Sequence, residues 1–397
     1  MRIAHVTDYY LPRLGGIEMH VSDLAARQAA LGDDVTIITS SPSDSPAASP
    51  SPSPRSRSGA RAVHEDGEGG PAVIRLTDGL RHPHASHPLA LRAGDLAVRD
   101  GDYDVVHVHA GTWTPFAFWV ALAAARADIP VVMTIHSLWA WAHPIFWVLD
   151  RLLGFSRRGI RWTAVSAVAA EQVQRVVGAG GDVSVLPNGI DPERWDVEPA
   201  PRSPDDVLVV AVMRLVFRKR PKPLLKMLRI ARAQTPADIS IRAVLVGEGP
   251  ARPALERYLR RHGMADWVSL PGRQPREQIR DLYRRADVFV APADLESFGI
   301  AALEAHCAGV PVLAKSGNGI ADFVRDEHDG LLCKDDAAMA AGLIRLCSQP
   351  LLRRALAGHH TVRSPVSWTS TLELTYAAYR EAVALSERSL DDVEVAS

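Results

Sequence analysis

Short apolar stretches rich in valine and isoleucine alternate with segments of helical periodicity along most of the chain. In the first half these stretches are Arg2–Thr7, Val35–Thr39, Val73–Leu76, Asp104–His109, Val131–Ile135 and Trp162–Val165. Their length and composition are typical of buried strands. The clearest helical segment places Ile17, Val21, Leu24 and Leu31 on one face and ends at Gly32. Strands that alternate with helices predict a parallel sheet covered on both faces.

A second series of the same kind begins after the proline-rich segment Pro199–Pro204, which we interpret as a linker. Its apolar stretches are Val207–Val212, Ile241–Val246, Val268–Leu270, Asp287–Ala291 and Val310–Ala314. The pattern predicts two doubly wound, Rossmann-like α/β domains, residues 1–198 and 199–365, which face a central cleft. Ligands of such sheets bind at the carboxyl ends of the strands.

Residues 40–70 interrupt the first domain with Ser/Pro repeats followed by a stretch of Gly and Glu. This composition cannot bury enough apolar surface to order itself. We therefore predict a disordered loop, which we interpret as a tolerated insertion rather than a regulatory segment.

Composition narrows the range of partners and compartments. The 45 basic and 46 acidic residues leave a formal net charge of −1, so we expect no nucleic-acid partner. Three cysteines lack metal-ligand spacing, and their odd number favours a reducing compartment. The N-terminus has no secretion-signal pattern, and the apolar run 115–125 is shorter than the roughly 20 residues of a membrane-spanning helix. We predict a cytoplasmic protein without a transmembrane segment.

Two glutamates follow the buried strand that ends near residue 291. Glu296 lies on the loop after the strand, and Glu304 lies about one turn inside the helix that opens near Gly299. The amide N–H groups of Phe298, Gly299 and Ile300 have no partner within that helix and point out of its N-terminus. A carboxylate binds vicinal sugar hydroxyls and helix-terminal amides stabilise a diphosphate, so the segment suits a sugar nucleotide.

The same segment resembles the signature of the family 4 retaining glycosyltransferases (group 1), which have the GT-B fold. The two glutamates are separated by seven residues that include Ser-Phe-Gly-Ile, and Gly-Val-Pro-Val begins at Gly309. The resemblance implies that Glu296 contacts hydroxyls of the transferred sugar and that Glu304 contacts the ribose. It also implies that the amides of residues 298–300 contact the sugar and the phosphate, and that residues 366–397 form a closing helix that crosses back onto the first domain.

A cationic motif lies after the first strand of the second series. Arg214 and Lys219 resemble the family's Arg-Leu…Lys motif, in which both cations hold the donor diphosphate. Fixed cations stabilise the transition state because the leaving diphosphate gains negative charge. The motif departs from the family pattern, which has glycine where this chain has Met213 and Arg220.

Three glycine turns resemble glycine loops of the same family. They are Gly15–Gly16 before the first helix, Gly247 with Gly249 after a strand, and Gly317 with Gly319. The resemblance implies that the first approaches the donor phosphates or the acceptor, the second the nucleotide, and the third the nucleotide diphosphate. The missing side chain permits such close approach.

Histidines end two buried strands of the first domain. His136 matches the family's histidine near the reacting sugar, and His109 matches a second histidine that lines the cleft. His107 and His109 lie on one side of their strand, which could suggest a metal. No third ligand is apparent and the family usually needs no metal, so we predict neither a metal nor a cofactor.

Six of the nine tryptophans lie between residues 113 and 162, in the domain that binds the acceptor in this family. The apolar segment Leu138–Arg158 ends in basic residues, as interfacial helices often do. Core packing and a lid over an apolar acceptor explain it equally well. We predict weak peripheral membrane contact at most, at the inner face of the membrane.

These features together predict a retaining glycosyltransferase. It would transfer a hexose from GDP-mannose, UDP-glucose or UDP-N-acetylglucosamine to a hydroxyl of a glycolipid, inositol-type or glycan acceptor, with the leaving phosphate assisting proton removal. The alternatives are a sugar-nucleotide epimerase of the same fold and a non-catalytic glycosyltransferase-like partner subunit. A dinucleotide-dependent oxidoreductase fits poorly, because Gly15–Gly16 lacks the three-glycine fingerprint.

Overall fold

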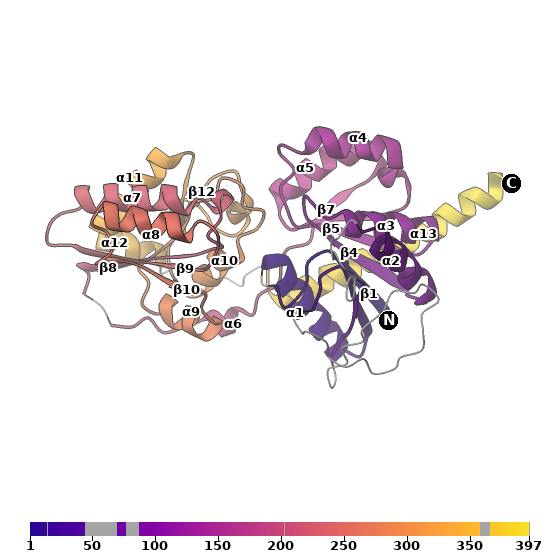
Figure 1. Cartoon of the computed structure of the whole chain (residues 1–397), viewed down its shortest axis with the longest axis horizontal. Coiled ribbons are helices and arrows are strands. Elements are labelled where there is room, and N and C mark those ends of the chain that lie inside the picture. Colours follow the sequence, from indigo (N-terminus) through magenta and orange to yellow (C-terminus); the bar gives the residue numbers. More distant parts are fainter. Residues whose placement is uncertain (14, 44–69, 77–86, 202, 358–365, 397) are drawn as a thin grey trace. The chain divides into compact units, whose positions relative to one another are not determined.

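A computed structural model of the chain describes residues 1–13, 15–43, 70–76, 87–201, 203–357 and 366–396. The chain forms two compact units, Met1–Gly189 with Trp368–Ser397, and Ile190–Ser367 (Figure 1). The first unit ends at Gly189, before the proline-rich segment where composition placed the boundary. Most of the loop predicted at residues 40–70 lies outside the described residues.

The first unit is built on a seven-stranded sheet in the order β3-β2-β1-β4-β5-β6-β7, with every pairing parallel. Its strands are β1 (Arg2–Thr7), β2 (Asp34–Thr39), β3 (Ala72–Arg75), β4 (Val105–Ala110), β5 (Val131–Ile135), β6 (Arg161–Ala164) and β7 (Val183–Val185). Every residue of β4 and β5 is buried, as expected for central strands covered on both faces. The register of β1 and β4 places His5 beside His107 and Thr7 beside His109.

Six α-helices accompany this sheet in the described residues. They are α1 (Gly16–Ala30), α2 (Pro88–Asp100), α3 (Pro115–Arg126), α4 (His143–Leu153), α5 (Ala167–Val177) and α13 (Trp368–Ala396). The last helix packs on β4, β5 and β6, although it follows the second unit in sequence. Its residues Ala378, Tyr379 and Ala382 share a buried cluster with Ile3 and Val132, so α13 completes the core of the first unit.

The second unit is built on a six-stranded sheet in the order β10-β9-β8-β11-β12-β13, again with every pairing parallel. Its strands are β8 (Asp206–Val212), β9 (Ser240–Val246), β10 (Val268–Gly272), β11 (Val288–Ala291), β12 (Val312–Lys315) and β13 (Gly330–Cys333). Its α-helices are α6 (Pro192–Trp195), α7 (Pro221–Gln234), α8 (Arg252–Arg261), α9 (Arg276–Tyr283), α10 (Ile300–Cys307), α11 (Asp336–Ser348) and α12 (Pro350–Ala357). Apolar residues of β8, β9, α7 and α11 make one buried core.

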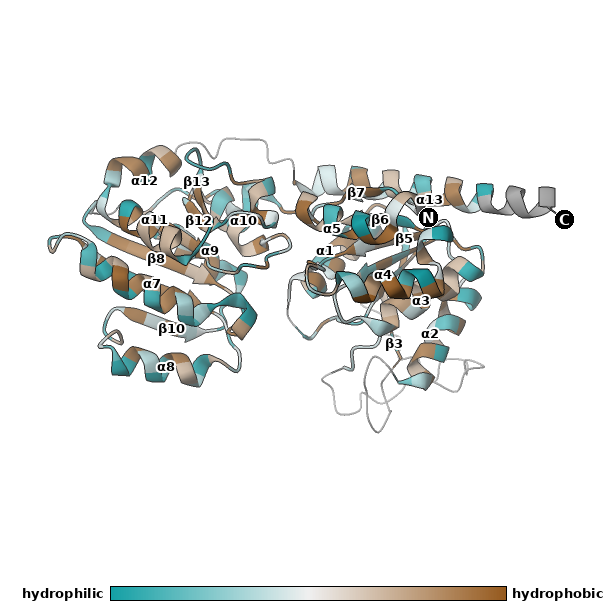
Figure 2. Cartoon of the chain, turned by 90° about the horizontal axis from the view of Figure 1, so that it is seen from above, coloured by the Kyte–Doolittle hydropathy of each residue, from teal (hydrophilic) through white to brown (hydrophobic). Residues whose placement is uncertain are grey.

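The prediction of two doubly wound parallel sheets is confirmed, and the structure adds the edge strands β7 and β13. Hydrophobic and hydrophilic residues lie next to one another along α7, as Figure 2 shows, whereas α3 is apolar except for Arg126 at its end. Of the helices that the structure describes, none combines the length and apolarity needed to cross a bilayer.

Candidate active site

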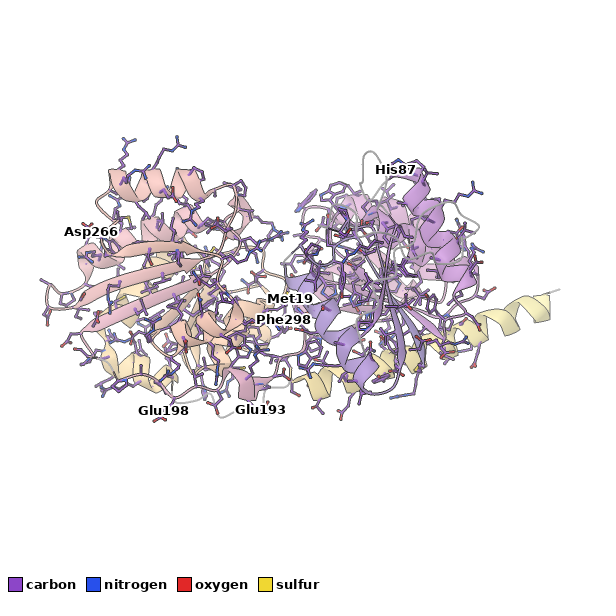
Figure 3. The ribbon with its side chains drawn as sticks, turned by 60° about the horizontal axis from the view of Figure 1, so that its bottom comes forward. Met19, His87, Glu193, Glu198, Asp266 and Phe298 are labelled. Carbon is purple, nitrogen blue, oxygen red and sulfur yellow. The ribbon has the colours of Figure 1, made fainter. Side chains whose placement is uncertain are left out.

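The loop between β11 and α10 carries Glu296 in the second unit. Gly299 ends this loop with φ of 93°, a left-handed conformation that favours glycine. A Cβ on Gly299 would lie 2.6 Å from Cγ1 of Ile320, so close packing also excludes a side chain there. Phe298, labelled in Figure 3, is buried with its ring centroid 5.7 Å from that of Phe323. The Phe298 side chain therefore anchors the loop and leaves only its backbone to a ligand.

Glu296 forms an ion pair with Lys219, far from it in sequence. The distance between Lys219 Nζ and Glu296 Oε2 is 2.5 Å, and both side chains are partly buried, with 22% and 15% exposed. Lys219 ends the short 3-10 helix Phe217–Lys219, which follows β8 and precedes α7. The fold thus brings together the cation and the carboxylate that the sequence assigned to the diphosphate and the sugar.

Arg220, which stands where the family has glycine, adopts a left-handed conformation with φ of 58°. Its guanidinium pairs with Asp294 and Asp336. Lys315, at the end of β12, also pairs with Asp336 at 2.6 Å and lies 3.4 Å from Asp294. Partial burial acts to raise the pKa of Asp336, but the hydrogen bond from Lys315 and the charge of Arg220 lower it overall. Sequence reasoning missed Lys315 and both aspartates.

The turn of Gly247 and Gly249 supports the loop that carries Arg214. A Cβ on Gly247 would lie 1.9 Å from the carbonyl oxygen of Met213, and one on Gly249 would lie 2.4 Å from that of Leu215. The Met213 amide donates a hydrogen bond to the Val246 carbonyl at 3.0 Å, and the Leu215 amide donates one to the Glu248 carbonyl at 2.8 Å. The glycines permit this backbone contact, while the Arg214 side chain is exposed.

The loop of Gly317 and Gly319 contacts the Glu296 loop directly. The Gly319 amide donates to the Glu296 carbonyl at 2.8 Å, and a Cβ on Gly319 would lie 2.1 Å from the Ser297 carbonyl oxygen. Gly317 has φ of 74°, and its α-carbon faces open space. Two of the predicted glycine loops therefore hold the segments that carry the predicted charged residues.

Glu304 is the fifth residue of α10 and is partly buried. Burial, and then the negative charge of Glu304, raise the pKa of the nearby Cys307 thiol to about 12. That pKa leaves the Cys307 thiol protonated and unreactive at neutral pH.

Gly15 and Gly16 open α1 in the first unit. Gly15 is the N-cap residue, and a Cβ on it would lie 2.4 Å from Oε2 of Glu18. Glu18 is buried in the first turn of α1 and lies 3.2 Å from the Arg13 guanidinium. A carboxylate at this helix N-terminus disfavours an anionic ligand and favours a hydroxyl.

A chain of buried side chains extends inward from His136, which follows β5. His136 Nε2 lies 3.1 Å from His109 Nδ1, His109 Nε2 lies 2.9 Å from His5 Nδ1, and His5 Nε2 lies 2.7 Å from Gln28 Oε1. A neutral imidazole has one donor and one acceptor nitrogen. Because Gln28 Oε1 can only accept, His5 donates to it from Nε2 and keeps Nδ1 as an acceptor. His109 Nε2 therefore donates to His5 Nδ1, and His136 Nε2 donates to His109 Nδ1. His136 thus keeps Nδ1 as its acceptor.

The same glutamine joins a second set of buried groups. Gln28 Nε2 donates to the Tyr379 hydroxyl at 3.1 Å, which lies 3.0 Å from His107 Nδ1. His107 Nε2 lies 2.7 Å from Thr134 Oγ1, which lies 2.6 Å from Thr163 Oγ1. Tyr379 comes from α13, so the C-terminal helix takes part in fixing the orientation of the Gln28 amide.

His5 supplies the third imidazole that sequence reasoning found missing. Ring nitrogens of His5, His107 and His109 lie within 4.8 Å of one another, a spacing that suits a metal ion. Each of these nitrogens already takes part in one of the hydrogen bonds described above. The absence of a third candidate ligand was therefore a wrong premise, but the hydrogen-bond network accounts for the cluster without a metal.

All the histidines of this cluster have lowered pKa values. Burial lowers the pKa of His5 to about 4 and that of His136 to about 3. His20 of α1 is also buried, and its ring centroid lies 5.5 Å from that of His136. Burial, with smaller contributions from neighbouring histidines, holds the pKa values of His20, His107 and His109 well below the ordinary value. The imidazoles are neutral at physiological pH, which agrees with the donor order given above.

Asp8 is a further buried group that sequence reasoning did not identify. It follows β1, and its carboxylate accepts hydrogen bonds from the amides of Phe116 at 3.3 Å and Ala117 at 2.8 Å, in the first turn of α3. Burial raises the pKa of Asp8 to about 7 and outweighs the opposing effect of these two amides. Its signal in the sequence was a carboxylate directly after a buried strand. Asp8 fixes the start of α3.

Comparisons with known proteins agree with this architecture. The profile described as "Glycosyltransferase Family 4" matches residues 14–194, and that described as "Glycosyl transferases group 1" matches residues 194–359. The glycogen synthase of Mycobacterium tuberculosis (strain ATCC 25618 / H37Rv) is 29% identical over 96% of this chain and 95% of its own. The phosphatidylinositol N-acetylglucosaminyltransferase gpi3 subunit of Schizosaccharomyces pombe is 25% identical over 94% of this chain and 79% of its own.

A similar fold is found among solved structures. Anabaena Alr3699/HepE in complex with UDP-glucose superposes with a TM-score of 0.66 at 18% identity and covers 100% of both chains. At this identity the likeness shows the fold alone. It is the same two-sheet α/β architecture that the present chain adopts.

Proposed function

The chain belongs to the family 4, group 1 glycosyltransferases, and from this premise we propose that it is a metal-independent, retaining hexosyltransferase. The observation that carries the proposal is the Lys219–Glu296 pair, which holds a cation and a carboxylate 2.5 Å apart. Such a pair suits the junction of a sugar and a diphosphate, because the carboxylate accepts hydrogen bonds from sugar hydroxyls while the cation beside it binds the diphosphate. Glu304, on the helix that follows, would accept hydrogen bonds from the ribose.

Each side chain has a defined part in the proposed reaction. Glu296 binds hydroxyls of the transferred hexose, while Arg214 and Lys219 bind the diphosphate. As the bond from the sugar to the phosphate breaks, negative charge grows on the leaving oxygen, so fixed cations stabilise the transition state more than the ground state. The acceptor hydroxyl attacks from the face that the diphosphate leaves, and the leaving phosphate takes its proton. His136 binds the sugar through hydrogen bonds.

We propose a uridine diphosphate hexose, either UDP-glucose or UDP-N-acetylglucosamine, in preference to GDP-mannose. Support comes from the complex of HepE with UDP-glucose, and from the named activity of the gpi3 subunit as an N-acetylglucosaminyltransferase. We place the reaction in the cytoplasm, which suits three cysteines that are all free in the structure.

A donor screen tests the proposal in its simplest form. A ligand that binds only the native state raises the melting temperature by mass action. We expect UDP-hexoses to stabilise the protein in thermal-shift measurements without added metal, and GDP-mannose to do so less. Stabilisation that appears only with a divalent cation would overturn the metal-independent site.

Substitution of Glu296 tests the role of the pair. Glu296→Gln keeps the shape but removes the charge, so we expect kcat/KM for transfer to fall by about 10²-fold or more. The matched control is Glu327→Gln, an exposed glutamate of the same unit that pairs with Arg345. Near-normal turnover of Glu296→Gln would refute the assignment. Product analysis without an acceptor separates a transferase from an epimerase, because only an epimerase converts the donor sugar under that condition.

A further inference from the structure

An apolar pocket of about 390 Å³ lies within the first unit. Phe118 and Leu122 of α3, Phe146 and Leu149 of α4, and Val176 of α5 contribute to its walls. Small-molecule pockets in proteins have volumes of roughly 300–1,000 Å³. This pocket is therefore large enough for an organic ligand, and most of its lining residues are aliphatic or aromatic.

The chemistry of the walls excludes a sugar as the main occupant. The one carboxylate among the lining residues, Asp150, accepts hydrogen bonds from the Ser156 amide at 2.7 Å and the Ser156 hydroxyl at 2.8 Å. The other polar groups of the lining are few, namely two threonine hydroxyls and the unpaired indole N–H groups of Trp139 and Trp162, so a sugar in this pocket would lose more hydrogen bonds to water than it could replace. A hydrocarbon chain has no hydrogen bonds to lose and gains from the burial of its surface.

An exposed apolar surface adjoins the pocket. Trp113 and Trp119 line the pocket yet are 63% and 46% exposed, so they stand at its mouth. Trp141 contacts Trp113 with ring centroids 6.0 Å apart, and Trp147 on α4 is also exposed. We call these four residues the tryptophan collar. Tryptophan is favoured where an apolar environment meets a wet one, as at a membrane surface.

Helix α4 continues this surface beside the collar. Of its residues only Phe146 and Asp150 are buried, while Leu152 is 75% exposed, and Figure 2 shows hydrophobic residues next to hydrophilic ones along the helix. Arg151 and Arg157 are exposed, and the segment 138–158 contains no acidic residue except the buried Asp150. Apolar side chains flanked by cations complement an anionic lipid surface.

The pocket begins next to His136. Thr112, which lines the pocket, donates a hydrogen bond from Oγ1 to Oγ of Ser137 at 3.0 Å. Ser137 follows His136 directly, and Trp139, two residues further on, also lines the pocket. A ligand whose chain fills the pocket would therefore carry its polar end beside the histidine that we assign to the reacting sugar.

We propose that the α3–α4–α5 pocket binds the hydrocarbon chain of a lipid acceptor, taken from a membrane surface on which the tryptophan collar and α4 lie. The proposal rests on the proposed function in one respect, since the hydroxyl of the lipid head group is the acceptor. Binding of the chain itself requires neither a donor nor catalysis.

Fluorescence titration with dansyl-undecanoic acid, without any sugar donor, tests the pocket. We expect saturable binding to the wild type, and at least about 10-fold weaker binding to Leu122→Trp and to Val176→Phe, because each substitution fills the pocket. Stabilisation of both variants by a UDP-hexose serves as the control for folding and for the donor site. Equal probe affinity in the wild type and both variants, or no saturable binding to the wild type, would overturn the proposal.

Vesicle co-sedimentation tests the membrane surface. We expect the wild type to sediment with phosphatidylcholine vesicles that contain phosphatidylglycerol, and Leu152→Ser to sediment several-fold less. The matched control is Leu351→Ser, which changes a leucine of similar exposure, 78%, in the second unit. Sedimentation of Leu152→Ser equal to the wild type would refute docking through α4. Because none of these measurements involves transfer, their failure leaves the donor chemistry untouched.

Discussion

Five buried histidines make the stability of the first unit sensitive to mild acid. His5 and His136 have pKa values lowered to about 4 and about 3, and those of His20, His107 and His109 are also well below the ordinary value. In the unfolded chain each returns to a pKa of about 6.5. Below pH 6.5 these histidines are therefore protonated in the unfolded state but stay neutral in the native state.

The sign and the size follow from linkage. A depressed pKa stabilises the native state above the unfolded pKa, and this stability is lost as the pH falls from about 6.5 toward the native values. For each histidine that stays neutral in the native state, the free energy of unfolding falls by about 2 kcal/mol between pH 7 and pH 5. Protonation of His5 and His136 in the unfolded state together lowers the free energy of unfolding by about 4 kcal/mol, against a typical total stability of about 5–15 kcal/mol. His20, His107 and His109 act in the same direction, while Asp8, whose native pKa is raised to about 7, opposes them because the native state takes up its proton first.

Urea denaturation measured from pH 7.5 to pH 5.5 by tryptophan fluorescence tests this. We expect the free energy of unfolding to fall steeply below pH 6.5, with a slope that corresponds to several protons. His5→Gln should lower the slope by about one proton. The control His262→Gln, which changes an exposed histidine of α8's C-terminal cap, should leave it unchanged. A wild-type slope below one proton throughout this range would show that the native histidines are charged, and the reasoning would fail.

Two further predictions concern the loops of the second unit. Arg220 has a left-handed backbone, which costs a non-glycine residue about 1 kcal/mol. Arg220→Gly should therefore be about 1 kcal/mol more stable to urea than Arg220→Ala, since both variants lose the ion pairs with Asp294 and Asp336 and differ only in this cost. Equal stability of the two variants would show that the backbone of Arg220 is not strained. Gly319→Ala should be destabilised by about 1–3 kcal/mol and should bind the donor more weakly, because its Cβ would meet the Ser297 carbonyl, whereas Gly70→Ala, which meets no atom, should melt like the wild type.

The central strands could be predicted from the sequence because each is a continuous apolar run. The edge strands β3 and β10 carried enough of this signal to be predicted, whereas β7 and β13 are too short to stand out. β7 has three residues, of which none is buried, and β13 has four, one of them a glycine. Both were missed, although the sheets to which they belong were predicted correctly.

Motif spacing identified residues whose loops the fold does bring together, such as Lys219 with Glu296 and Gly319 with the Glu296 carbonyl. It did not reveal partners that depend on strand register. Lys315 reaches Asp294 and Asp336 because β12 lies between β11 and β13 in the sheet. His5 was visible as a polar residue inside a buried strand, but its place beside His107 follows from the parallel pairing of β1 with β4.

The buried network also constrains what His136 can contribute to chemistry. A pKa of about 3 means that the imidazole is almost never protonated near neutral pH, so it is poorly suited to donate a proton to a leaving group. Its Nε2–H is engaged by His109, which leaves Nδ1 as an acceptor for a hydroxyl. These properties favour a role in orienting a sugar hydroxyl. Charge on the departing diphosphate would then be stabilised by permanently charged groups such as Arg214, not by a histidine that must first be protonated.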